Sequence, residues 1–414
     1  MRPFRLLPAQ KSSDRTRVAL AASLLASLAG LLLFVSGCAL APRRSPGRTY
    51  LETKAATLPA HIISNFFVIE SKGNDGRAYR FIVDTGSTAT LVTPELARRF
   101  AVKMKGPPPA KVAVRSANGG QIDLDPVTLK SITLGEATFE RVPALVHDLS
   151  SLSNHLGVPI DGILGFPLFR NTLLTLDYPG EQMIIAPSPA FPPPPKVDPR
   201  TSIIPFNGER NTPLIPVQMG TESFIVLIDT GSDGSLSLNP SGLHPRFASG
   251  PRPGTLISSL QGDRQQLTGR LSQNVLVGSQ VIEQPIVDLS DQLSSLGGEF
   301  LRNFTITFDQ RHRQVTFVRH TDGSVTMGPR LSTGLAFARS PAYWRVLTVI
   351  PQTPTADLAV QEGDLCVRIN GETVDKWTFD RYAALVNSAA KITYTFITGS
   401  KETDIEVPVF SLVP

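Results

Sequence analysis

Two aspartates, Asp84 and Asp229, each follow an apolar run and each begin the same four residues, Asp-Thr-Gly-Ser. The runs, residues 81–83 and 224–228, are rich in residue types that favour β-strands. One such motif commonly marks only a turn, because Asp and Gly suit turns. Two copies, each opening a matching segment, indicate a pair of carboxylates. When two carboxylates lie close together they share a proton, so one acts as base and the other as acid.

Such a pair can activate a water molecule to attack an amide carbonyl and then protonate the departing nitrogen. The residues after each aspartate suit this chemistry. Small glycines let the two backbones approach closely. Threonines would hydrogen-bond across the pair, and serine hydroxyls would bond the outer carboxylate oxygens. The sequence therefore predicts Asp84 and Asp229 as catalytic, supported by Thr85, Gly86, Ser87, Thr230, Gly231 and Ser232.

Strand and turn patterns predict the elements that carry the first aspartate. A turn at 72–76 joins strands at 66–69 and 79–83, and the second strand delivers Asp84. A short helix is expected at 94–100, with Thr93 as N-cap. Asn-Gly within 112–124 predicts another hairpin.

The order of these features repeats later in the chain. A hairpin tip is expected at 258–263, residues 284–290 answer 142–150, and 296–303 answer 164–171. The agreement spans most of 60–318, which predicts an internal duplication.

On these motifs the chain resembles the pepsin-like and retropepsin-like aspartic proteases. The doubled Asp-Thr-Gly-Ser is similar to their active-site motif, and Asp-Gly-Ile-Leu-Gly at 161–165 to the segment behind their catalytic loop. In the second half Leu293-Ser294-Ser295 replaces Asp161-Gly162-Ile163. The resemblance implies a mostly β, bilobed pepsin-like fold of two retropepsin-like β-barrel lobes, at 57–186 and 201–322. It also implies a substrate-covering flap with its tip at Asn118, Gly119 and Gly120.

Residues 330–414 have a different pattern and resemble a PDZ domain of α+β type. Gly334-Leu335-Ala336-Phe337 is similar to the loop that binds a peptide carboxylate in that family, although Ala336 stands where Gly is usual. A helix is expected at 379–388, with closing strands at 392–397 and 403–410. The resemblance implies binding of peptide C-termini by strand addition. The alternative is a small β-rich domain that only packs on the rest.

The N-terminus has the form of a targeting segment. Basic residues precede an apolar run at 18–35, which leads into Ser36-Gly37-Cys38. This ending resembles the lipobox of bacterial lipoproteins, so residues 1–38 are expected to be a signal peptide with lipidation at Cys38. An uncleaved signal anchor is the alternative. A flexible linker is expected at 39–56, and a stiff, proline-rich linker at 187–200. The protein is then exported and tethered to a membrane of the bacterial cell envelope, on the periplasmic face.

Charge and cysteine content exclude several other functions. The net charge is +5, but residues 1–37 hold five basic residues and one acid, so about +1 remains without them. This balance gives no argument for nucleic-acid binding. Only Cys38 and Cys366 are present, and no His/Cys spacing suits a metal. No cofactor is expected.

The sequence predicts an aspartic endopeptidase acting on protein or peptide substrates. A catalytically silent peptide-binding protein that keeps the cleft is the alternative from another class. A protease whose aspartates pair only between two molecules is a further possibility. Covalent linkage raises the effective concentration of one half for the other, which favours a monomer with an intramolecular pair.

Overall fold

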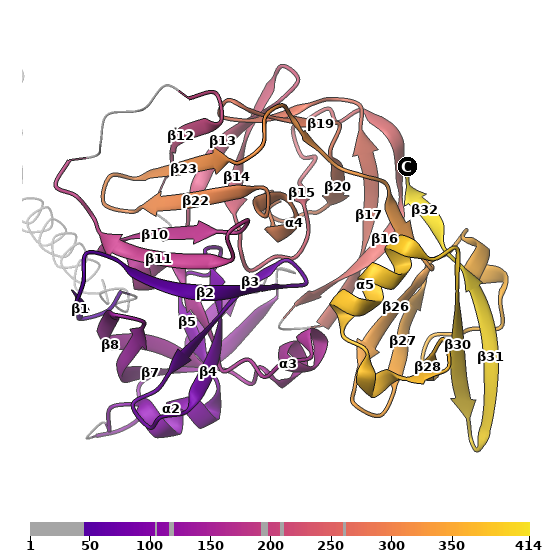
Figure 1. Ribbon diagram of the computed structural model, residues 1–414, viewed down its shortest axis with the longest axis horizontal. Helices are drawn as coiled ribbons and strands as arrows, with labels where there is room; N and C mark the ends of the chain where they lie inside the picture. Colours follow the sequence, from indigo (N-terminus) through magenta and orange to yellow (C-terminus); the bar gives the residue numbers. More distant parts are fainter. Residues whose placement is uncertain (1–44, 104–105, 116–119, 192–197, 208–210, 260–261) are drawn as a thin grey trace, which may run out of the picture. The chain divides into compact units, whose positions relative to one another are not determined.

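The computed structural model describes residues 45–103, 106–115, 120–191, 198–207, 211–259 and 262–414, and these are mostly β-strands (Figure 1). The expectation of a mostly β chain is confirmed. The strands form two large sheets and a smaller one, with a further two-stranded pair.

The first sheet begins with an antiparallel meander. Its strands are β2 (Ala56–Ile63), β3 (Phe66–Lys72) and β4 (Ala78–Asp84). Strand β9 (Gly162–Gly165) then runs parallel to β4 and antiparallel to β5 (Thr90–Val92). From β5 the sheet continues through β8 (Ala137–Val146) and β7 (Gln121–Leu134) to β6 (Val112–Arg115). Buried positions alternate along β2, so one of its faces packs into the core.

The second sheet has the same order of strands. It runs from β13 (Leu214–Met219) and β14 (Glu222–Ile228) through β21 (Ser295–Leu296), β15 (Leu236–Leu238), β20 (Ile286–Leu289) and β17 (Gly262–Leu271) to β16 (Phe247–Ser259). Strand β21 is parallel to β14, and β15 is parallel to β20. The first sheet has the same two parallel pairs, β9 with β4 and β5 with β8. Strands β18 (Val275–Val277), β19 (Gln280–Glu283) and β24 (Val325–Thr326) complete it, so this sheet extends beyond the expected boundary at 322.

Five further strands extend the first sheet beyond β2 and include strands from both halves of the sequence. The order is β12 (Thr201–Pro205), β23 (Gln314–Arg319), β22 (Phe304–Asp309), β10 (Thr172–Asp177), β11 (Gln182–Pro187) and then β2. Strands β10 and β22 are antiparallel neighbours, with Thr175 opposite Thr307. Because this pairing joins residues far apart in sequence, it fixes the position of one half against the other.

The segment expected as a flexible linker at 39–56 is partly a strand, which corrects that expectation. Strand β1 (Arg48–Leu51) pairs antiparallel with β8. Its side chains alternate between exposed and half-buried, and the Gly47 N–H donates to the Glu140 carbonyl at 2.7 Å. A strand this short depends on pairing with a distant partner.

Short helices connect the strands. The expected helix is confirmed as α2 (Pro94–Phe100), where the Thr93 hydroxyl accepts from the Leu96 N–H. Helices α3 (Ser150–Leu156) and α4 (Gly298–Leu301) and the 3₁₀ turn η1 (Phe166–Phe169) follow later in the chain.

The C-terminal segment has its own sheet and core. The sheet order is β26 (Leu335–Arg339), β27 (Trp344–Val349), β28 (Leu365–Ile369), β30 (Lys391–Thr398) and β31 (Lys401–Pro408), with β29 (Glu372–Thr373) beside β28. Helix α5 (Phe379–Ser388) has the expected bounds. Trp344 and Tyr394 are fully buried in the core. Strand β25 (Arg330–Ser332) pairs with β32 (Phe410–Val413), and η2 (Pro354–Asp357) and η3 (Val374–Lys376) are 3₁₀ turns.

Candidate active site

The two aspartates meet where β4 and β14 end. Asp84 is the last residue of β4, and Asp229 follows β14 directly. A Cβ added at Gly86 would lie 2.3 Å from an Asp229 carboxylate oxygen, and one at Gly231 would lie 2.3 Å from the Asp84 carboxyl carbon. Each carboxylate therefore packs over the glycine of the opposite motif. Only glycine permits this approach, as the sequence predicted.

Two buried threonines bind the motifs to each other with reciprocal hydrogen bonds. The Thr85 hydroxyl donates to the Ile228 carbonyl at 2.6 Å, and the Thr230 hydroxyl donates to the Val83 carbonyl at 2.6 Å. Each hydroxyl also accepts the other threonine's backbone N–H, at 3.0 and 3.2 Å. The expected bonding of the threonines across the pair is thus present in the structure, and it satisfies four buried backbone groups.

Burial and mutual proximity raise the pKa of both carboxyl groups. Desolvation raises the pKa of Asp84 to about 6, although backbone N–H groups of Ser87 and Gly86 favour its ionised form. Desolvation and the negative charge of Asp84 raise the pKa of Asp229 well above its ordinary value of 3.8. Asp84 accepts the Ser87 N–H at 2.9 Å, and Asp229 accepts the Gly231 N–H at 3.0 Å. Asp84 is therefore the better carboxylate, and Asp229 the better holder of a shared proton.

The serines differ from expectation. The Ser87 hydroxyl donates to the Ala89 carbonyl at 2.7 Å, so the backbone N–H and not the side chain bonds Asp84. The Ser232 N–H donates to the Asp229 carbonyl at 3.3 Å. The side chain of Ser87 prefers the carbonyl two residues ahead because this local bond closes a tight turn.

A glycine packs behind each Asp-Thr-Gly-Ser loop. A Cβ at Gly165 would lie 2.4 Å from the Ala89 carbonyl, and one at Gly297 would lie 2.3 Å from the Gly234 carbonyl. Gly165 pairs with Asp84 in the β4–β9 ladder, and Leu296 pairs with Ile228 in the β14–β21 ladder. The second half thus has an equivalent support despite its departure at 293–295.

The hairpin expected to carry the flap is present as β6 and β7, paired from Val112 opposite Leu124 to Arg115 opposite Gln121. Of the expected tip, Asn118 and Gly119 lie outside the described residues, and Gly120 directly precedes β7. The hairpin strands contribute half-buried apolar side chains to a cluster that includes Ile82 and Ile163.

Two residues near the pair were not predicted from the sequence. The Asn65 amide donates to the Asp233 carbonyl at 2.9 Å and so fixes the loop that follows Asp229. Tyr178 is buried, and its hydroxyl has no partner among the described residues. Desolvation and the charges of Asp229 and Asp84 raise its pKa. Only long-range packing brings these side chains close, so no local pattern announces them.

The residues expected to form a carboxylate-binding loop lie mostly within strand β26. Gly334 precedes it with a φ of +77°, and the Leu335 and Phe337 side chains are buried. The Gly334 N–H donates to the Ser332 hydroxyl at 2.9 Å, and the Leu335 N–H donates to the Thr333 hydroxyl at 3.4 Å. Strand β26 is at the end of its sheet's order, so one of its edges has no strand partner among the described residues.

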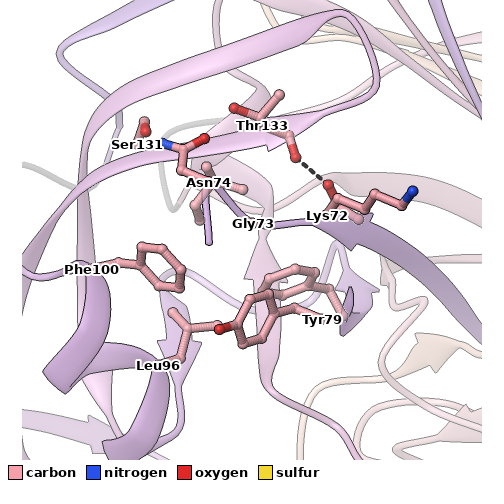
Figure 2. Close-up of a pocket in the computed structure, with 11 residues that line it drawn as sticks. Lys72, Gly73, Asn74, Tyr79, Leu96, Phe100, Ser131 and Thr133 are labelled. Atoms are coloured by element: carbon pink, nitrogen blue, oxygen red, sulfur yellow. Dashed lines mark hydrogen bonds between the residues drawn. The ribbon is translucent and has the colours of Figure 1, made fainter. Parts of the chain in front are cut away.

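A cavity of about 30 Å³ lies in the first half, away from the aspartates. Figure 2 shows Leu96, Phe100 and Tyr79 on one side of it, with Asn74 and Ser131 on the other. The Tyr79 and Phe100 rings pack edge to face, with their centroids 5.5 Å apart. This volume holds about one water molecule, so the cavity is no substrate site.

A family model described as aspartyl protease matches residues 70–168. The match includes Asp84, the β6–β7 hairpin and β9. It supports a hydrolase of the aspartic protease type. No curated protein matches the chain.

No group of three or more His, Cys, Asp or Glu in the described part of the chain could hold a metal ion. The described residues also contain no helix long and apolar enough to span a membrane. The apolar run at 18–35 and Cys38 lie outside them.

Proposed function

We propose that the protein is an aspartic endopeptidase with Asp84 and Asp229 as its catalytic pair. The observation that carries the proposal is the reciprocal packing of each carboxylate over the opposite glycine, joined by the threonine bonds. Support also comes from the equal strand order of the two sheets, which suits a bilobed pepsin-like fold with lobes at 57–186 and 201–322. One chain contains both aspartates, which favours a monomer.

In the proposed reaction a water molecule lies between the two carboxyl groups. Asp84, ionised, takes a proton from the water as it attacks the peptide carbonyl carbon. Asp229, protonated, donates its proton to the carbonyl oxygen, and a tetrahedral diol forms. The C–N bond then breaks as the nitrogen receives a proton from Asp84 and a diol hydroxyl returns one to Asp229. No metal or cofactor is required for these steps.

The test is cleavage of a peptide library by the full chain and by Asp84→Asn and Asp229→Asn. Asp322→Asn, at an exposed turn, is the matched control. We expect Asp84→Asn and Asp229→Asn to lose cleavage while they keep the circular dichroism spectrum of the unsubstituted chain. The control should retain both cleavage and spectrum. If a variant that carries both Asp84→Asn and Asp229→Asn cleaves at the rate of the unsubstituted chain, the proposal is overturned. Tight peptide binding without any cleavage by the unsubstituted chain would favour the catalytically silent binder.

We further propose that residues 330–414 are a PDZ-like domain that binds peptide C-termini at the edge strand β26. This edge has no strand partner among the described residues and lies beside helix α5, which supports strand addition there. Helix α3 lies against β26 and α5, with Gly157 beside the Arg339 guanidinium and the His155 and Phe379 ring centroids 4.5 Å apart, so a peptide at that end would displace α3. The Gly334 and Leu335 N–H groups would exchange their hydroxyl acceptors for the stronger carboxylate. Peptides with a free C-terminus should therefore bind the full chain more tightly than the same peptides amidated. Equal affinities would argue that this domain only packs on the protease.

The proposed location is the bacterial cell envelope, with a lipid on Cys38 as the tether. In cells, Cys38→Ala should shift the protein from the membrane fraction to the soluble fraction, provided that export continues. Retention in the membrane would favour the uncleaved signal anchor.

A further inference from the structure

A larger cavity than that of Figure 2, of about 480 Å³, opens near the turn between β22 and β23. Its volume lies within the range of pockets that bind small organic ligands. Two aromatic side chains, Phe166 and Phe206, line it and are buried, with ring centroids 5.9 Å apart. Nothing in the proposed peptidase reaction uses this cavity.

Three arginines from two separate segments line the cavity. Arg170 follows η1, and Arg311 and Arg313 lie at the turn after β22. No described residue in the lining is a carboxylate, and no ion pair among described residues engages any of the three guanidinium groups. A concave surface lined by charges of one sign focuses its field and attracts counter-ions. Three guanidinium groups therefore create a positive potential that an anion would relieve.

A carboxylate near the cavity, Asp309, is already engaged. One of its oxygens accepts the Ser188 hydroxyl at 3.2 Å and the backbone N–H of Arg311 at 3.1 Å. The other oxygen lies 2.6 Å from His312 Nδ1. Asp309 is buried, so its carboxylate does not face the arginines as a free counter-ion. The cavity retains excess positive charge.

Two polar side chains around the cavity, those of Gln310 and Arg170, are held in place. Gln310 donates its amide to the Phe166 carbonyl at 2.6 Å, and the Arg170 guanidinium donates to the Asn211 amide oxygen. Such anchoring reduces the entropy lost when a ligand binds. Guanidinium groups bind phosphate through paired, parallel hydrogen bonds.

We propose that this cavity binds a phosphate-bearing ligand through Arg170, Arg311 and Arg313. The phosphate group contacts the guanidinium groups, and the organic part of the ligand fills the space over Phe166 and Phe206. The phosphate belongs either to a free phosphorylated metabolite or to a phospholipid headgroup. The site is independent of the proposed peptidase activity, so neither claim depends on the other.

The experiment is calorimetric titration of the full chain in detergent micelles. Inorganic phosphate and glycerol phosphate represent free ligands, and mixed micelles that contain anionic rather than zwitterionic phospholipid represent the headgroup. The test variant carries Arg170→Gln, Arg311→Gln and Arg313→Gln. The matched control carries Arg77→Gln, Arg252→Gln and Arg345→Gln, which remove the same charge from exposed positions elsewhere.

We expect the unsubstituted chain and the control to bind, and the pocket variant to bind at least about tenfold more weakly, as for lost charge-assisted contacts. The single variant Arg311→Lys keeps the positive charge but loses the paired hydrogen bonds of a guanidinium group, so its affinity should lie between that of the control and that of the pocket variant. Binding by glycerol phosphate identifies a free ligand, and binding by the anionic mixed micelles alone identifies the headgroup. Equal affinity in the pocket variant, an equal loss in both triple variants, or no binding by the unsubstituted chain would overturn the proposal.

Discussion

Identical residues need not be chemically equal, and the two Asp-Thr-Gly-Ser copies illustrate this. Asp84 receives backbone N–H groups from Ser87 and Gly86, whereas Asp229 receives that of Gly231 and also faces the charge of Asp233. The environment of Asp84 stabilises its ionised carboxylate, whereas the environment of Asp229 favours its protonated form. In the proposed reaction, the division of labour between base and acid would therefore come from the loops around the aspartates, because the four-residue motifs are the same.

The shared proton sets the pH dependence of cleavage. Below about pH 6, set by Asp84, both carboxyl groups are protonated and no base remains. At the higher pKa of Asp229 the shared proton is lost. We therefore expect a bell-shaped profile of kcat/KM whose acid limb lies near pH 6, measured with a fluorogenic peptide. The two limbs belong to the pair as a whole. A rate that keeps rising as the pH falls well below that limb would contradict the assignment.

The same carboxyl groups should reduce the stability of the fold at neutral pH. A pKa that is raised in the folded state means that the folded chain binds more protons than the unfolded chain. Stability therefore falls as the pH rises from 3.8 through the raised pKa of Asp229. The asparagine in Asp229→Asn cannot ionise, so this variant should melt at a higher temperature than the unsubstituted chain at neutral pH. The difference in melting temperature between the two should shrink near pH 4. Calorimetric melting checks this, with Asp322→Asn as control; a gain that grows on acidification would contradict it.

Tyr178 allows a further prediction, because its buried hydroxyl has no partner among the described residues. An unsatisfied buried polar group costs about 1–3 kcal/mol. Tyr178→Phe keeps the edge-to-face contact with Phe67, whose ring centroid is 5.0 Å away. We expect the urea midpoint of the variant to rise or stay unchanged. A clear loss of stability would reveal a bound water molecule as the missing partner.

Among the elements, those with local signals were the ones the sequence predicted well. Helices α2 and α5 begin after Thr93 and Thr378, whose hydroxyls accept from the first turn. Helix α3 was missed, since its N-cap Leu149 offers no such bond. Strand β1 was missed because its partner β8 is distant in sequence. A local pattern cannot report a long-range pairing.

In the candidate site, too, residues with a local signal were predicted and residues that depend on long-range packing were missed. The aspartates, glycines and threonines could be predicted because a repeated motif implies that the two copies meet. The Ser87 hydroxyl was misassigned because two acceptors lie within its reach and only the structure decides between them. Asn65 and the cavity arginines were missed because they become neighbours only when distant segments pack.

The threonine bonds give a prediction at the scale of the two strand ends. Thr85→Val removes a hydroxyl that donates to the Ile228 carbonyl and accepts the Thr230 N–H. Two buried backbone groups lose their partner, at about 1–3 kcal/mol each. We expect Thr85→Val to lower both the free energy of unfolding and kcat, and Thr85→Ser to restore most of both. The half-exposed pair of Thr133 with Thr138 provides the control, Thr133→Val. Equal losses in the two valine variants would exclude a special role for Thr85.

For the chain as a whole, contacts connect the C-terminal segment with the sheets that carry the aspartates. Asp380 of α5 accepts the Ser64 N–H at 2.8 Å, and the Arg270 guanidinium donates to the Pro414 carbonyl. Ile286 of β20 packs with Leu412 and Val413 of β32. These contacts combine hydrogen bonds of charged side chains to the backbone with apolar packing, so substitutions in the C-terminal segment can change the stability of the sheets that carry the aspartates.

Arg330, at the start of β25, makes a buried ionic contact with the second sheet. Its guanidinium donates to Asp288 at 2.7 Å, with side-chain exposures of 15% and 11%, and it also reaches Glu299. Breaking a buried pair leaves a buried charge without its partner, which costs about 3–5 kcal/mol. Lys391 and Glu406 are also 2.7 Å apart, but are 64% and 56% exposed. An exposed pair contributes at most about 1 kcal/mol. In urea unfolding of the full chain, Arg330→Ala should therefore lose far more stability than Lys391→Ala. Similar losses in both would show that Asp288 finds water or another cation once Arg330 is removed.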